Sequence, residues 1–387
     1  MTHQNFSRRD LFVRGGAALG TLGIGRAVKA APAPAAGVAI GRCGSFDRAQ
    51  VEQTMRTLFD QIGGIGPLVK NKTVALKLNL TGKPTNFPID PKLPYRSDPN
   101  TVLAAAHLFA QAGARRIRIL ETFFPARQDL ELWARYQLDI NAINNVGCKV
   151  EWENAQNLGN AKQYARLKVT SNPYMFASYE LNHSFVDCDT YVSLSKLKDH
   201  FVAGVTMSLK NNFGITPASL YGGDCGRDGN ENPDQERGPV CHNGTTPPAS
   251  PVERELHPDS PRDAGFRVPR FVADLVRVRP IDLCIVDGIE SIRGGEGVWI
   301  KGVQGIKPGV MLAGKNPVCT DAVSMAVMGY DPRADRGTKP FLRGDNTLKL
   351  AEAVGVGTTD LSRIEVLGLS IKEALHPYGP GATGAAV

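Results

Sequence analysis

The chain has 387 residues, which is long enough for one large domain or two ordinary domains with a hydrophobic core. Its 42% hydrophobic and 21% charged residues are typical of a globular protein, and no apolar run approaches the roughly 18 residues of a membrane-spanning helix. The formal net charge is +7, but residues 1–30 hold five basic residues against Asp10, which leaves about +3 for the rest. The charge therefore argues against a nucleic-acid partner.

The N-terminus has the pattern of a targeting segment. Arg8 and Arg9 follow Ser7, residues 15–25 form a mildly apolar stretch rich in Gly and Ala, and small residues end at Ala30. This pattern predicts a twin-arginine signal peptide over residues 1–30, although an ordinary basic start is the alternative. We then expect the twin-arginine export machinery as a partner, a periplasmic or extracellular location, and no stable membrane span after cleavage.

Residues 38–376 alternate short β-rich runs with helical stretches after a linker at 31–37. The alternation predicts a single α/β domain with a mostly parallel sheet flanked by helices. In the run 73–80, every second residue is apolar and falls on one face, whereas Lys77 and Asn79 fall on the other. Asp98 followed by Pro99 predicts the start of a helix that ends at Gly113.

The remaining elements continue this alternation. Further strands are expected at 117–120, 149–152, 191–194, 281–286, 310–313 and 363–367. Further helices are expected at 130–144, 201–212, 271–277, 317–328 and 347–354.

Two segments lie outside the alternation. Residues 217–262 are rich in Gly, Pro, Asp and Asn without a clear period, which predicts a long loop insertion or a lid. Residues 377–387 are expected to be a disordered tail.

Seven cysteines are present, and none forms a C-x-x-C pair. The sequence therefore has no iron–sulfur or zinc-ribbon motif. Cys225 and Cys241 flank the middle of the loop and are candidates for a disulfide in an oxidising compartment.

Polar residues follow four of the predicted strands. In open parallel sheets, ligands bind outside the carboxyl ends of the strands. The basic run 195–200 and Lys210 could bind a carboxylate or phosphate, and a desolvated lysine could act as base or nucleophile. The alternative is a solvated, charged surface. The candidate catalytic residues are Lys196, His200 and Lys210, and the candidate substrate-binding residues are Lys77, Asn79, Glu121, Ser195, Lys198, Thr206 and Asn211.

A second group is acidic and Gly-rich. Its carboxylates could hold a divalent metal or act as acid and base, and the alternative is a solvated Gly-rich turn. The run 294–297 does not match G-x-G-x-x-G, so a dinucleotide site is poorly supported. The candidate metal ligands are Asp287, Glu290, Glu296 and Asp321. We expect one cleft to bring together Lys77, Lys196, Lys210, Asp287 and Asp321.

The runs 195–200, 204–206 and 209–214 resemble the signature of the bacterial domain of unknown function family 362. The resemblance extends over roughly residues 38–370, apart from 217–262. The family usually has Pro where this chain has Ser195 and Thr where it has Asp199. Some members carry a ferredoxin-like cysteine cluster that this chain lacks, and the family brings no settled activity.

Three functions remain open from the sequence. The first is an enzyme acting on a small anionic substrate, with or without a divalent metal. The second is a non-catalytic periplasmic solute-binding or carrier protein. The third is a cofactor-containing redox protein, because the twin-arginine route carries folded proteins.

Overall fold

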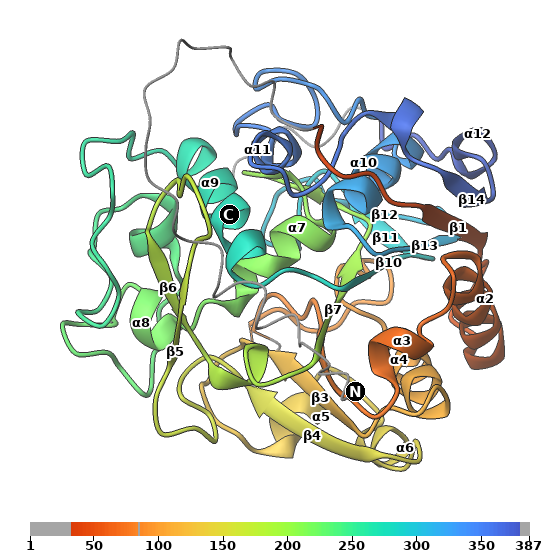
Figure 1. Ribbon diagram of the computed structural model, residues 1–387, viewed down its shortest axis with the longest axis horizontal. Coiled ribbons are helices and arrows are strands. Elements are labelled where there is room, and N and C mark those ends of the chain that lie inside the picture. Colours follow the sequence, from red (N-terminus) through yellow and green to blue (C-terminus); the bar gives the residue numbers. More distant parts are fainter. Residues whose placement is uncertain (1–31, 84–85, 380–387) are drawn as a thin grey trace, which may run out of the picture. The chain divides into compact units, whose positions relative to one another are not determined.

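An eight-stranded sheet organises the protein in the computed structural model, which describes residues 32–83 and 86–379 (Figure 1). Seven strands run in one direction, and one strand, β13, is antiparallel to both of its neighbours. The expected α/β class with a mostly parallel sheet is confirmed. The strand order is β14 (Val366–Gly368), β1 (Val38–Arg42), β13 (Val310–Gly314), β10 (Leu283–Gly288), β7 (Thr190–Lys196), β2 (Thr73–Lys77), β3 (Arg116–Glu121) and β4 (Lys149–Asn154).

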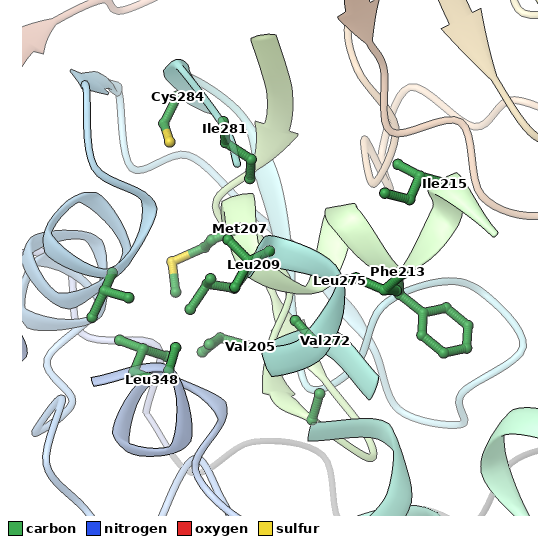
Figure 2. Packing of buried hydrophobic residues seen from close by; sticks show 14 of the residues in the cluster. Val205, Met207, Leu209, Phe213, Ile215, Val272, Leu275, Ile281, Cys284 and Leu348 are labelled. Atoms are coloured by element: carbon green, nitrogen blue, oxygen red, sulfur yellow. The ribbon is translucent and has the colours of Figure 1, made fainter. Parts of the chain in front are cut away.

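Helices cover both faces of this sheet, and each face has its own hydrophobic core. One face packs against α2 (Arg48–Gln61), α3 (Gly66–Val69), α4 (Pro99–Gln111), α5 (Leu130–Ala134) and α6 (Ile140–Asn144). The other packs against α7 (Met207–Asn211), α9 (Ala264–Val278), α10 (Pro317–Val327), α11 (Thr347–Ala353) and α12 (Ile371–Ala374). Figure 2 shows Met207 and Leu209 of α7 packed among side chains of α9 and α11.

The alternation in β2 decides which side chains each core receives. Val74 and Leu76 lie in the core under α2 and α4, whereas Ala75 lies in the core on the α7 side. Lys77, two residues after Ala75, therefore also points to the α7 side. The helix expected after Asp98 is α4, and the Asp98 carboxylate caps it by accepting a hydrogen bond from the Asn100 N–H.

Two expected helices are wrong in extent. Instead of one helix over 201–212, the chain forms a tight hairpin of β8 (Asp199–His200) and β9 (Gly204–Val205) before the short α7. Gly204 has φ +78° and Met207 has φ +40°, conformations that a continuous right-handed helix cannot contain. The helix expected over 130–144 is likewise divided into α5 and α6, because Gln137 between them has φ +62°.

The segment 217–262 is packed against the domain. It contains α8 (Ala218–Tyr221) and a wide helical turn over Gly238–His242, and the side chains of Val240, Ala249 and Val252 are buried. Two further small sheets pair β5 (Ala165–Lys168) with β6 (Ser178–Leu181) and β11 (Ser291–Arg293) with β12 (Gln304–Ile306).

The structure also bears on the expected disulfide and on the expected C-terminal tail. Cys225 and Cys241 are both buried free thiols, so the candidate disulfide is not formed. The disordered tail cannot begin at 377, because Tyr378 is fully buried and its hydroxyl donates to the Leu197 carbonyl. The predicted signal peptide lies outside the described residues. Within the described part of the chain, we find no helix with the length and apolar character needed to cross a membrane.

Candidate functional site

The strand order reverses between β2 and β7. The chain passes from β2 outward to β3 and β4, and then returns to place β7 on the other side of β2. Ligands of open α/β folds bind at the carboxyl ends of the strands beside such a reversal. A cavity of about 530 Å³ lies there, lined by Lys77 and Asn79 after β2, Glu121 at the end of β3 and Lys198 just beyond β7.

The lining of this cavity is both cationic and aromatic. Five Lys and Arg side chains face three Glu side chains, which leaves an excess of two positive charges when both histidines are neutral. The charged and histidine residues are Lys77, Lys83, Glu121, Lys198, His200, Lys210, Glu236, Arg237, His242 and Glu296. The aromatic wall consists of Phe87, Phe123, Phe124, Phe213 and Trp299. Such a lining suits an anion that carries a flat apolar body.

Lys77 and Glu121 form a buried ion pair at the base of the cavity. Lys77 Nζ lies 2.5 Å from Glu121 Oε1 and also donates to the Leu78 carbonyl at 2.7 Å. Burial lowers the pKa of Lys77, and the attraction of Glu121 opposes that decrease. A Cβ at position 214 would lie 3.0 Å from this ammonium, so Gly214 leaves room for it. The pair neutralises itself and fixes the base of the site.

Two asparagines continue this polar floor. Asn79 Nδ2 donates to Asn211 Oδ1 at 3.1 Å, and Asn211 Nδ2 donates to Ser193 Oγ at 2.9 Å. Asn79 Oδ1 is buried and has no hydrogen-bond partner among the described residues. Because an unpaired buried oxygen is costly, this atom is suited to accept a hydrogen bond from a ligand or a water molecule.

Glu296 is an ionised carboxylate on the wall of the cavity. Its Oε2 accepts from the Phe201 N–H at 2.8 Å and its Oε1 from Trp299 Nε1 at 3.1 Å. Burial raises the pKa of Glu296, whereas these two hydrogen bonds lower it and favour the ionised carboxylate. Burial lowers the pKa of His200 to about 3, and His200 Nδ1 accepts from the N–H groups of residues 202–203. His200 is therefore neutral at pH 7. The Phe201 N–H and Trp299 Nε1, rather than a charged His200, keep Glu296 ionised.

Lys198 is a fully buried lysine, and no carboxylate of the described residues lies in hydrogen-bond contact with it. Its Nζ donates to the carbonyl oxygens of Tyr95 at 2.6 Å and Glu296 at 2.9 Å. Burial holds the pKa of Lys198 well below its usual range. Since its acceptors are neutral carbonyls, any positive charge on Lys198 is available to an anionic ligand.

Lys210 differs from the other lysines of the cavity because its ammonium has no acceptor among the described residues. The Nζ atom lies 4.2 Å from the centroid of the Phe213 ring. Burial lowers the pKa of Lys210, Glu296 opposes this decrease, and the positive charges of Arg237 and Lys77 add to it, with a net pKa of about 8. An unpaired amine with such a pKa is suited to proton transfer or nucleophilic attack.

The position of Lys210 depends on α10. Asp321 of α10 accepts from the backbone N–H groups of Ser208 at 2.9 Å and Leu209 at 2.8 Å, and so caps the start of α7. Burial raises the pKa of Asp321 to about 7, while these hydrogen bonds lower it. Asp321 is thus a positioning residue beneath α7, and it does not line the cavity.

The segment 217–262 closes one side of the cavity with Arg237 and His242. Arg237 Nε donates to the Thr216 carbonyl at 2.6 Å and Nη2 donates to Gln156 Oε1 at 2.7 Å. Burial lowers the pKa of His242 to about 3, and its ring centroid lies 5.5 Å from that of Phe213. Sequence reasoning missed both residues, although the length of the loop had suggested a lid.

The expected single cleft forms only in part. The predicted site residues that line the cavity are Lys77, Asn79, Glu121, Lys198, His200, Thr206, Lys210, Asn211 and Glu296. Lys196 and Asp287 pair at 3.0 Å, both fully buried, and lie beside Phe46 and Thr101 on the α2–α4 side of the sheet. Period-2 alternation places Lys196 with Val192 and Leu194 of that core, and therefore away from the cavity.

The four candidate metal ligands are not brought together. Glu296 lines the cavity, Asp321 caps α7 and Asp287 pairs with Lys196, whereas Glu290 pairs with Lys307 at 2.6 Å. Ser195 is buried, with its hydroxyl 3.4 Å from the Ile285 carbonyl. Among the residues that the structure describes, no group of three or more His, Cys, Asp or Glu side chains could hold a metal ion. A metal role for these acids has no geometric support here.

The model of the domain of unknown function family DUF362 matches residues 74–326, about two thirds of the chain. No curated protein matches the chain. The matched range contains every residue that lines the cavity.

Proposed function

The chain belongs to the DUF362 family, and from its cavity we propose that the protein is an enzyme that acts on a small anionic substrate. Lys210 is the reactive group of this proposal, and Lys198 and Arg237 attract the anion. The observation that carries the proposal is the Lys210 ammonium, which has no hydrogen-bond acceptor among the described residues, inside a half-open, cationic cavity.

The other cavity groups support binding more than chemistry. Lys77 and Glu121 neutralise each other, and His200 is a neutral acceptor for backbone N–H groups. Lys198 and Arg237 direct their hydrogen bonds to neutral oxygens, and Glu236 lies 3.7 Å from Arg237 Nη1, beyond hydrogen-bond distance, so both side chains can still attract an anion. Since Lys210 has no such partner, it is the lysine best suited to react.

Binding of simple anions to the purified protein tests the first part of this proposal. We expect benzoate or phenylacetate to raise the melting temperature of the wild type more than acetate does, because of the aromatic wall. Lys210→Met should weaken binding by about tenfold, the loss of one charge-assisted contact. Lys372→Met, a change at an exposed helix residue outside the cavity, is the matched control. If no organic or inorganic anion stabilises the protein, the proposal is wrong.

A non-catalytic solute-binding protein would use the same cavity. The two functions differ in whether a bound compound is changed. Bound compounds should be released from natively purified protein, identified by mass spectrometry and followed by NMR during incubation with fresh enzyme. Tight binding without conversion of the recovered compound would favour the binding protein.

We also propose that the protein is exported through the twin-arginine route. The support is the sequence alone, with Arg8 and Arg9 before a Gly- and Ala-rich stretch. Replacing both arginines by lysine should retain the protein in the cytoplasmic fraction, whereas the wild type should reach the periplasm. Equal distribution of the two forms would contradict this proposal.

A further inference from the structure

We propose that the substrate is a carboxylate with a ketone or aldehyde group and a flat apolar body, and that Lys210 Nζ forms a Schiff base with its carbonyl carbon. This inference rests on the proposed function, because it requires that the cavity bind an organic anion. It adds the class of substrate and the covalent step.

The amine of Lys210 is more available for reaction than those of the other lysines in the cavity. A lysine attacks a carbonyl through the lone pair of its neutral nitrogen. Ion pairs and hydrogen bonds to acceptors keep a lysine nitrogen protonated and hold it away from a substrate. Lys77 is paired with Glu121, Lys83 lies 2.8 Å from Asp234 Oδ1, and Lys198 donates to two carbonyls. Lys210 Nζ, in contrast, has no hydrogen-bond acceptor among the described residues and lies 4.2 Å from the centroid of the Phe213 ring.

The surroundings of this amine favour its neutral form. Burial disfavours a charge on Lys210, and the positive neighbours Arg237 and Lys77 act in the same direction, against the attraction of Glu296. With a pKa of about 8, roughly one Lys210 side chain in ten is neutral at pH 7, compared with fewer than one in a thousand for an ordinary lysine. The cavity thus supplies the reactive form of the amine near neutral pH.

The cavity can also hold the rest of such a molecule. Among the described residues, no carboxylate lies within hydrogen-bond distance of Lys198, and the Glu236 carboxylate lies 3.7 Å from Arg237 Nη1, so a substrate carboxylate could bond directly to both. Phe213 and Trp299 line the cavity and supply apolar surface for a flat group. Asn79 Oδ1, buried without a partner among the described residues, can accept a hydrogen bond from a hydroxyl formed on the substrate.

The covalent step balances without an added reagent. The neutral amine adds to the carbonyl carbon, a C–N bond forms, and the carbonyl oxygen takes up the proton that nitrogen releases. The resulting carbinolamine loses its hydroxyl with one further proton as water, and the C=N bond forms. Water that reaches the half-open cavity can carry these protons, because a histidine with a pKa of about 3, such as His242, is too weak a base to do so.

Reductive trapping tests the inference on the purified protein. The wild type is incubated with phenylpyruvate and sodium cyanoborohydride, digested and mapped by mass spectrometry. We expect one dominant adduct, on the peptide containing Lys210, with the mass of phenylpyruvate less one oxygen atom. Phenyllactate, which has a hydroxyl in place of the ketone, should bind without forming an adduct.

Lys210→Arg is the matched variant, because it keeps the positive charge and cannot form a Schiff base. It should lose the adduct while retaining phenyllactate binding, measured by calorimetry, within about tenfold of the wild type. Binding of phenyllactate without a Lys210 adduct from phenylpyruvate would overturn the Schiff base and leave the proposed function standing. If phenylpyruvate, phenyllactate and the simpler anions all fail to bind, both the Schiff base and the proposed function are wrong. Adducts spread evenly over exposed lysines would also refute the inference, and wild-type mapping gives this result even if the variant does not fold.

Discussion

Lys210→Met should make the protein more stable at neutral pH, even though it removes the proposed reactive group. Met keeps an unbranched apolar chain against the Phe213 ring and carries no charge. The folded protein holds the pKa of Lys210 at about 8, compared with 10.5 for an ordinary lysine. The wild type therefore loses stability by burying a charge that the unfolded chain keeps in water.

The magnitude follows from the difference between these two pKa values. Taken at face value, it corresponds to roughly 3 kcal/mol. Lys210 retains contact with solvent in the cavity, which screens part of the cost, so we expect a gain of about 1–2 kcal/mol for Lys210→Met. The melting temperature should rise by on the order of 2–4 °C at pH 7.

The stability advantage of Lys210→Met over the wild type should decrease as the pH rises. Between about pH 8 and pH 10.5 the unfolded chain binds more protons at this site than the folded chain, so the wild type regains stability as the pH rises. The advantage of Lys210→Met is full below pH 8 and disappears by about pH 10.5.

Urea unfolding of the wild type and Lys210→Met at pH 7 and pH 10 measures this difference. Lys372→Met serves as a control for the loss of a surface charge. If Lys210→Met is less stable than the wild type at pH 7, or if its advantage stays constant up to pH 10, the ammonium is not desolvated as the structure indicates. Both proposals above would then lose their main support.

Two further changes test the surroundings of the cavity. Glu121→Gln leaves Lys77 buried without its carboxylate and should cost about 3 kcal/mol or more, which the double change with Lys77→Met should partly restore in urea unfolding. If Glu121→Gln unfolds at the same urea concentration as the wild type, the Lys77–Glu121 ion pair does not stabilise the protein. Asp321→Ala removes the acceptor for the N–H groups of Ser208 and Leu209 and should cost roughly 2 kcal/mol while weakening anion binding. Loss of stability with unchanged anion affinity would contradict its role in positioning α7.

Local patterns predicted most of the fold. The cap expected at Asp98 is present and accepts from the Asn100 N–H, and the helix expected from 317 begins there, with Asn316 accepting from two backbone N–H groups. The helix expected at 201–212 failed because Met207, a residue without turn propensity, adopts φ +40° beside Gly204. The carboxylate that caps α7 comes from Asp321, more than a hundred residues away, and no local pattern reveals it.

The sequence by itself determined the fold class, the family and the residue types of the site, because alternation, capping and signature motifs are properties of neighbouring residues. The tertiary structure alone decided which charges share a cavity. Alternation along β7 places Ser195 and Lys196 on opposite faces of the sheet. Only the register of β7 against β10 pairs Lys196 with Asp287 on the face away from the cavity. Likewise, only the packing of the segment 217–262 brings Arg237 and His242 beside Lys210, because contacts between distant segments depend on how the whole core closes.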